Sequence, residues 1–400
     1  MSKYDAIVIG AGHNGLTNAA YLAKSGLKVL VVEKNDYIGG ASVSRVLHEG
    51  WTYSNCSYVC SLLRPEIFRD LNLQKYGLQI LPYGGSVTFM QNGDIFGGYS
   101  DDDLARREIG RFSKRDADAY VRFARDVSRQ CRFIKPMLLR TPPDPTSFKP
   151  KDLGELIYLF KRLYSLGEQT IYDTIRFYTM SVAEYLDEYF ESDVIKAALS
   201  GSGIIGTGLG PYSPGTAYVL LHHYMGEVDG SIGSWGFARG GMGSIANALA
   251  DAFKDYDGEL LTDAEVSQII VKRGRAKGVV LSNGDEYYAK NIVSNLDVKR
   301  TYQKLFDPKD LSEKVLKQVD AFKIRGSSGK LNIALDGLPE FPALGKNNPL
   351  ICSDMHFIDS TERIERAYDD WKNGRWSRDP YADVLIPTMT DPTMSPPGKH

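Results

Sequence analysis

Three closely spaced glycines near the start of the chain have the spacing of a diphosphate-binding turn. Gly10, Gly12 and Gly15 form a G-x-G-x-x-G motif, and Ala11 and Asn14 lie within it. The first glycine permits a tight turn, the second lets a pyrophosphate approach the backbone, and the third lets a helix pack closely against a strand. The free N–H groups and the dipole at the start of such a helix attract the anion. The motif therefore predicts a binding site for a nucleotide diphosphate.

A carboxylate follows the glycines at the distance expected for a ribose contact. Glu33, with Lys34 directly after it, ends a second apolar run at residues 29–32. A carboxylate at the end of the second strand of a βαβ unit can accept hydrogen bonds from ribose hydroxyls. Together with the glycine turn, this residue predicts that the ligand is an adenine dinucleotide.

The elements around the motif are those that must position it. Residues 6–9 are short, apolar and β-branched, which is typical of a strand buried on both faces. Residues 16–23 place leucine and alanines on one helical face, and Gly26 stands where a helix commonly ends. Because 39 of the 400 residues are glycine, the motif alone is weak. Its placement between strand, helix and second strand makes the prediction specific.

A second glycine pair distinguishes between the dinucleotides. Gly39 and Gly40, followed by Ala41, would bring another backbone segment to the same ligand. With Glu33 and Lys34, this stretch resembles the extended FAD signature of the phytoene desaturase and amine oxidase superfamily. In that superfamily the acidic residue holds the adenosine ribose, and the second glycine pair lies along the pyrophosphate and ribityl chain. The resemblance implies that the cofactor is FAD.

The resemblance continues through nearly the whole chain. A glycine turn and helix, then Glu265 and Val266, then a β-meander resemble the second FAD-contacting segment of the superfamily. There the residue matching Val266 contacts the adenine through its backbone. In the meander we expect a hairpin strand at 285–289 and a separate short buried strand at 291–295. Further stretches resemble the branch named pyridine nucleotide-disulfide oxidoreductase domain-containing protein 2, namely residues 60–66, 218–227, 236–243 and 391–398.

The expected fold is α/β: a Rossmann-like FAD/NAD(P)-binding domain of the glutathione reductase type, split in sequence, with a second α+β substrate domain. The FAD-binding domain is expected at 1–77 and 236–300, and the substrate domain at 78–235 and 301–400. Relatives continue beyond the segment matching residues 396–398. The chain is therefore expected to be truncated at its C-terminus, with an incomplete substrate domain.

The region from residue 153 to residue 190 is amphipathic and rich in aromatic residues. One interpretation is a helical substrate domain with these aromatics packed in its core. The other is a surface that dips into a membrane to collect an apolar substrate. Acidic residues interspersed among the basic ones favour the first interpretation.

Catalytic residues are left open by the sequence. Residues 201–214 are glycine-rich but lack the Lys-Ser/Thr of a P-loop. His222 and His223 are candidates, and at most one is expected to face a given site because neighbouring side chains point in different directions. The cysteines have neither redox-dithiol nor zinc-site spacing, so no metal site is predicted.

Composition narrows the class of protein. Net charge is −2, with 24% charged and 42% hydrophobic residues, which is typical of a soluble enzyme and excludes charge-driven nucleic-acid binding. Because the first predicted strand begins within the first few residues, we expect no signal or transit peptide before it. We expect a cytoplasmic location, or the mitochondrial matrix in a eukaryote. Expected partners are a small apolar substrate, a weak peripheral membrane contact and a second copy of the chain in a homo-oligomer.

These observations together predict an FAD-dependent oxidoreductase that accepts a hydride from a largely apolar substrate. By resemblance the activity is phytoene dehydrogenase-like, either C–C desaturation or isomerisation. Flavin amine oxidase and a non-catalytic dinucleotide-binding protein are the alternatives. An NAD-dependent dehydrogenase would leave Gly39 and Gly40 unexplained.

Overall fold

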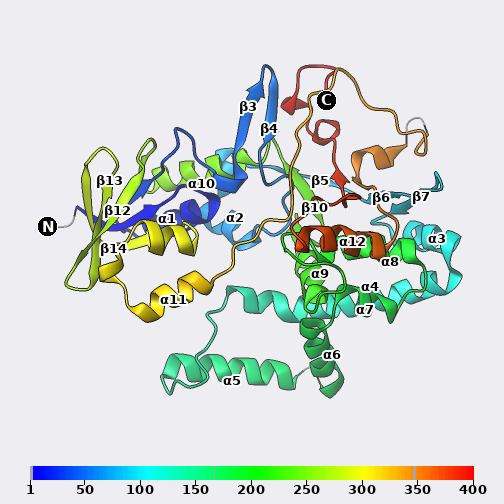
Figure 1. Ribbon diagram of the computed structural model, residues 1–400, viewed down its shortest axis with the longest axis horizontal. Helices are drawn as coiled ribbons and strands as arrows, with labels where there is room; N and C mark the ends of the chain where they lie inside the picture. The colour runs from blue at the N-terminus through cyan, green and yellow to red at the C-terminus, as the bar shows by residue number, and fades with distance from the viewer. Residues whose placement is uncertain (1–2, 166, 346–347) are drawn as a thin grey trace. The chain divides into compact units, whose positions relative to one another are not determined.

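The chain folds into two units, each assembled from segments that are distant in the sequence (Figure 1). Unit 1 comprises residues 1–82, 236–338 and 387–400, and unit 2 comprises residues 83–235 and 339–386. The computed structural model describes residues 3–165, 167–345 and 348–400.

Unit 1 is built on a six-stranded sheet with the order β11-β2-β1-β14-β13-β12. Figure 1 labels β12, β13 and β14 of this sheet. Its first four strands run parallel, and its last three form an antiparallel meander that shares β14. The strands are β1 (Tyr4–Ile9), β2 (Val29–Val32), β11 (Glu259–Leu261), β12 (Val266–Lys272), β13 (Arg275–Leu281) and β14 (Glu286–Ser294). The return of β14 beside β1 completes the nucleotide-binding domain across the sequence split.

Both faces of β1 and β2 are buried, as their apolar runs predict. One face packs against α1 (His13–Lys24) and α10 (Gly243–Asp255), which lie against each other through small residues. The opposite face contributes Ile7, Ile9 and Leu30 to a second core together with residues of the meander. Residues that alternate along a strand thus enter two different cores, which explains why polar positions are missing from these runs.

The last strand of the meander is longer than predicted. The sequence analysis divided it into strands at 285–289 and 291–295, whereas the structure has one continuous strand, β14. Residues near its start pair antiparallel with β13, and those from Ala289 onward pair parallel with β1. One strand can serve both partners because its two edges are used by different neighbours.

Unit 1 also contains several short elements outside this sheet. They are β3 (Ser44–His48), β4 (Trp51–Ser54), α2 (Pro65–Leu71) and α11 (Glu313–Ala321), with β5 (Ile80–Tyr83) paired to β10 (Trp235–Ala238). The helix α2 begins with Pro65, and proline is common at the first position of a helix.

The division into units differs from the domain boundaries expected from the sequence. Residues 301–338 and 387–400, which were assigned to the substrate domain, belong to unit 1. One reason is the fully buried Asp391, whose Oδ2 accepts a hydrogen bond of 2.6 Å from the Gly240 N–H just before α10. This long-range contact could not be read from composition.

Unit 2 contains a four-stranded sheet with the order β16-β15-β6-β7. Its strands are β6 (Ser86–Phe89), β7 (Ile95–Gly98), β15 (Asp354–His356) and β16 (Asp383–Val384). β6 and β7 form an antiparallel hairpin closed by Asn92 and Gly93, and Gly93 has φ of +86°. β15 adds parallel to β6, and β16 adds antiparallel to β15.

Helices make up the remainder of unit 2, and an aromatic core joins several of them. They are α3 (Asp102–Phe112), α4 (Lys114–Ile134), α5 (Pro150–Tyr164), α6 (Glu168–Thr179), α7 (Val182–Asp187), α8 (Asp193–Ser200), α9 (Thr216–Tyr224) and α12 (Thr361–Lys372). The Phe123 ring of α4 meets the rings of Tyr185, Tyr189 and Phe190 at centroid distances of 6.1, 5.6 and 5.3 Å. Packing of aromatics in a helical core is thus confirmed around α7, whereas α5 contributes no buried residue. None of the described helices is long and apolar enough to cross a bilayer.

Candidate dinucleotide-binding site

The glycine turn connects β1 to α1, and its glycines differ in how much space there is for a side chain. Gly10 has φ of +96°, which favours glycine, and Gly12 is the N-cap residue of α1. A Cβ atom on Gly15 would lie 2.2 Å from the carbonyl oxygen of Gly10. A Cβ atom on Gly12 would meet only the side chain of Asn295 at 3.1 Å and the Cα of Gly40 at 3.8 Å. Gly15 is therefore required for helix–strand packing, whereas Gly12 leaves room for a ligand.

The second glycine pair contacts the first glycine segment directly. The Gly39 N–H donates a 2.9 Å hydrogen bond to the Ala11 carbonyl, and a Cβ on Gly40 would lie 3.1 Å from the Gly12 Cα. Gly39 and Gly40 both have positive φ, at +116° and +56°. The structure thus brings together the two glycine segments that the sequence assigned to one ligand.

Glu33 holds the turn through its buried carboxylate. Its Oε2 accepts a 2.9 Å hydrogen bond from the Ala11 N–H, and its Oε1 accepts bonds of 3.0 and 2.9 Å from the backbone and side chain of Asn35. A carboxylate offers about four acceptor positions, so one position is left for a ribose hydroxyl. The ribose contact stays a prediction, and the geometry is compatible with it.

Val266 lies in a segment that runs beside Glu33. The Glu33 N–H donates to the Leu261 carbonyl, and the Ala264 N–H donates to the Glu33 carbonyl, each at 2.8 Å. Val266 then begins β12 and is 9% exposed. Its predicted backbone contact with adenine remains to be tested, but the ribose and adenine segments are neighbours.

The start of α1 is available to an anion. No side chain caps this helix end, and its first turn contains no acidic residue. Exposed Asn14 lies in that first turn, while Lys34 and Ala41 are exposed on the segments beside the glycine turn. A pyrophosphate therefore has unpaired backbone donors and a favourable dipole at this position.

Two residues at the turn were not selected from the sequence. Asn295 follows β14, its N–H donates to the Ile9 carbonyl at 2.9 Å, and its amide side chain covers the glycines. His13 lies 3.2 Å from the Ser42 hydroxyl through its Nδ1, and burial lowers the pKa of its imidazole. The only sequence signal for Asn295 is its place at the end of a predicted strand, and His13 lies inside the motif.

Lys330 is a further candidate residue of the cofactor site, and no sequence pattern indicated it. Its ammonium donates a hydrogen bond to the Ser54 carbonyl and lies 5.6 Å from the centre of the Tyr58 ring. Burial lowers the pKa of this lysine. The Ser54 hydroxyl accepts a 2.9 Å bond from the Met242 N–H at the start of α10. This places a desolvated lysine near the glycine-containing turn at residues 240–243, where α10 begins.

The two histidines suggested by the sequence both lie on α9 of unit 2. Burial lowers the pKa of each. His223 is 7% exposed, its Nδ1 lies 2.8 Å from the Val219 carbonyl, and its ring stacks on Trp235. These contacts give His223 a packing role, while His222 is half-buried. A catalytic role for either histidine stays a prediction.

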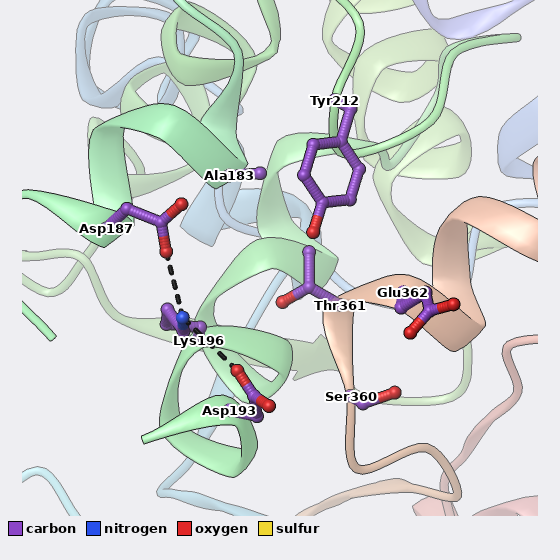
Figure 2. Close-up of a pocket in the computed structure, with 8 residues that line it drawn as sticks. All are labelled: Ala183, Asp187, Asp193, Lys196, Tyr212, Ser360, Thr361 and Glu362. Carbon is purple, nitrogen blue, oxygen red and sulfur yellow. Dashed lines mark hydrogen bonds and ion pairs between the residues drawn. The ribbon is translucent and has the colours of Figure 1, made fainter. Parts of the chain in front are cut away.

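A small pocket in unit 2 lies between α7, α8 and the start of α12 (Figure 2). Lys196 occupies one side and is paired with Asp187 at 2.8 Å and Asp193 at 3.2 Å. Tyr212 and Thr361 line the other side. Because its charges are already paired and its lining is largely polar, this pocket does not suit a large apolar substrate.

Comparisons with known proteins agree with this geometry. Residues 15–349 match the profile of the family described as flavin containing amine oxidoreductase. The "Pyridine nucleotide-disulfide oxidoreductase domain-containing protein 2" of Mus musculus is 34% identical over 425 residues, covering 100% of this chain and 72% of its own length. A chloroplastic prolycopene isomerase of Daucus carota is 28% identical over 417 residues, covering 100% of this chain and 60% of its own. The crystal structure of an oxidoreductase from Methanosarcina mazei has the same fold, with a TM-score of 0.57, 17% identity and coverage of 99% and 77%.

Proposed function

The chain belongs to the flavin containing amine oxidoreductase family and is an FAD-dependent oxidoreductase, and on this premise we propose that it oxidises a C–H bond of a largely apolar substrate. The activity would be phytoene dehydrogenase-like: either C–C desaturation, in which the substrate would lose a hydride and a proton, or isomerisation, in which no net electrons would be transferred. FAD, when bound, supplies the two-electron acceptor. The observation that carries the proposal is the contact between the Gly12 segment and the Gly39–Gly40 segment, since it forms one backbone cradle for an extended dinucleotide.

Each part of this cradle has a defined task. The Gly12 backbone, which carries no side chain, and the uncapped start of α1 receive the diphosphate. Glu33 fixes the turn and offers its remaining acceptor position to a ribose hydroxyl. The substrate class is supported by the name of the Daucus carota relative, which refers to a polyene. Fold similarity alone says little about substrate.

The proposed reaction is tested by anaerobic reduction of the bound flavin. The purified protein is reconstituted with FAD, filtered to remove free cofactor, and mixed without oxygen with a solubilised polyene or with a primary amine. We expect the flavin absorption to bleach with the polyene and to persist with the amine. Bleaching by the amine alone would establish the amine oxidase alternative. A protein that binds FAD, is reduced by neither compound and leaves the double-bond geometry of the polyene unchanged would contradict the proposed substrate class.

We also propose that α5 contacts a lipid surface, from which an apolar substrate could be collected. Four apolar side chains recur along this helix at spacings of four, three and four residues, which places them on one helical face. They are Leu153, Ile157, Phe160 and Tyr164, whose exposed fractions are 40, 55, 68 and 80%. Lys161 adjoins this stripe and would meet anionic headgroups, whereas Arg162 lies on the opposite face and donates hydrogen bonds to the Arg132 and Phe133 carbonyls. In Figure 1, α5 extends away from the other helices of unit 2.

Sedimentation with phosphatidylcholine–phosphatidylglycerol vesicles tests the lipid contact. The full chain is expected to sediment with the vesicles, and Phe160→Glu is expected to reduce the bound fraction by on the order of tenfold, because an exposed aromatic ring that would enter the lipid is replaced by a charge. Leu331→Glu is the control, since Leu331 is an apolar side chain in unit 1 with 81% exposure. Equal binding of the two variants would contradict a contact through α5.

A further inference from the structure

Three potential metal ligands meet on one face of the sheet in unit 2. Asp354, His356 and Asp383 each offer one ligand atom, and these atoms all lie within 4.8 Å of one another. The His356 Nε2 lies 3.4 Å from Asp354 Oδ2 and 3.5 Å from Asp383 Oδ1. The His356 side chain is 10% exposed, and the side chains of Asp354 and Asp383 are 22 and 17% exposed. None of these residues belongs to the dinucleotide-binding site.

Strand pairing explains why the three side chains converge. Asp354 and His356 are two residues apart on β15, so they point to the same face, while Met355 between them is fully buried on the other. Asp383 of β16 pairs directly with His356. Thr88 of β6 pairs with His356 from the other side.

Several buried polar atoms in and beside this cluster lack the hydrogen bonds that burial normally requires. Among the described residues, Asp354 Oδ1, Asp383 Oδ1 and His356 Nδ1 are buried without a hydrogen-bond partner, and so is the hydroxyl of Thr88. A charge-assisted bond between imidazolium and carboxylate is usually about 2.7–2.9 Å long. The separations of 3.4 and 3.5 Å exceed this range. The histidine therefore does not form a good direct bond with either carboxylate.

The same separations fit ligands arranged around an ion. Two ligands each about 2.1 Å from a tetrahedral metal lie about 3.4 Å apart. Two ionised carboxylates and a neutral imidazole carry two negative charges, which a divalent cation would neutralise. A nitrogen ligand among oxygens favours a first-row transition ion over magnesium or calcium.

We propose that Asp354, His356 and Asp383 bind one divalent transition-metal ion, with zinc as the representative ion, and that this ion fastens β16 to β15. β16 is a strand of only two residues, so its pairing alone is short. Water or the Thr88 hydroxyl would complete the coordination. The ion is structural, and the flavin reaction does not depend on it.

Zinc binding to the metal-stripped full chain tests this proposal. After chelator treatment and removal of the chelator, the protein is titrated with Zn²⁺ by calorimetry, and its thermal unfolding and FAD content are measured in parallel. We expect one equivalent to bind and, at about a hundredfold excess over the dissociation constant, the Tm to rise by about 5 °C. Mg²⁺ and Ca²⁺ should not produce this shift, and FAD content should not change.

Matched variants separate this site from adventitious surface binding. Asp383→Asn removes one of two neighbouring carboxylate charges and is expected to fold, but to bind Zn²⁺ at least tenfold more weakly. His356→Gln should have the same effect. His223→Gln is the control, because His223 lies in the same unit and is buried to the same degree. As whole residues, His223 is 7% exposed and His356 is 8% exposed. Unchanged Zn²⁺ affinity in Asp383→Asn, or no binding by the unsubstituted protein, would overturn the proposal.

Discussion

A Gly12→Ala variant is expected to remain folded and to lose its FAD. The added Cβ would meet the end of the flexible Asn295 side chain at 3.1 Å, and it would lie 3.8 Å from the Gly40 backbone. The N-cap conformation of Gly12, with φ of −70°, suits any residue. The protein itself can therefore accommodate the methyl group. A pyrophosphate that approaches this backbone cannot, and overpacking of about 1–3 kcal/mol corresponds to a roughly 5- to 150-fold weaker affinity.

The flavin absorbance retained after gel filtration and the affinity measured by flavin fluorescence quenching test this expectation. Thermal unfolding of the cofactor-free protein supplies the folding control, and its Tm should match that of the unsubstituted chain. Gly154→Ala is the matched substitution, because a Cβ at Gly154 would find nothing within 4 Å and this glycine lies on α5. Full FAD retention by Gly12→Ala would show that the diphosphate does not lie against this turn.

A Gly15→Ala variant is expected to fail for a different reason. Its Cβ would lie 2.2 Å from the Gly10 carbonyl oxygen, which belongs to the backbone and cannot rotate away. The helix α1 would have to move off β1, and the cost should reach about 3 kcal/mol, at the upper end of overpacking effects. For a unit of this size, that loss corresponds to a fall in Tm of about 10 °C.

Thermal unfolding of the cofactor-free Gly15→Ala protein measures this loss, without any contribution from ligand binding. Unfolding of Gly12→Ala under the same conditions is the comparison, since the two substitutions add the same methyl group three residues apart. A Tm equal to that of the unsubstituted chain would show that β1 and α1 tolerate a larger separation than the structure indicates. The pair of variants thus distinguishes a glycine kept for packing from one kept for the ligand.

The glycine turn could be predicted from the sequence because its parts are nearly contiguous. Gly10, Gly12, Gly15 and Glu33 fall within one strand–helix–strand unit, and short-range geometry fixes their relation. Position within the motif also implied different tasks for Gly12 and Gly15, and the Cβ distances of 3.1 and 2.2 Å give that difference a physical measure.

Segments joined only by long-range contacts were harder to assign. Residues 387–400 were expected in the substrate domain, yet the carboxylate of Asp391 attaches them to the Gly240 turn of unit 1. The strand β14 was divided in two, because its pattern does not show that it changes partner from β13 to β1. Neither feature has a local signal, since each depends on a partner far away in the chain.

The sequence by itself thus determined the α/β fold and the dinucleotide turn, because these depend on local glycine conformation and on apolar periodicity. The FAD-dependent class followed from the resemblance to the phytoene desaturase and amine oxidase superfamily. The tertiary structure decided which distant side chains meet. Spacing predicted no metal site, since Asp383 follows His356 by 27 residues and no motif joins them. Only the antiparallel pairing of β16 with β15 places His356 opposite Asp383. Burial leaves His356 Nδ1 and one oxygen of each aspartate without a hydrogen-bond partner. Because buried polar atoms are normally paired, this cluster could be recognised only from the fold.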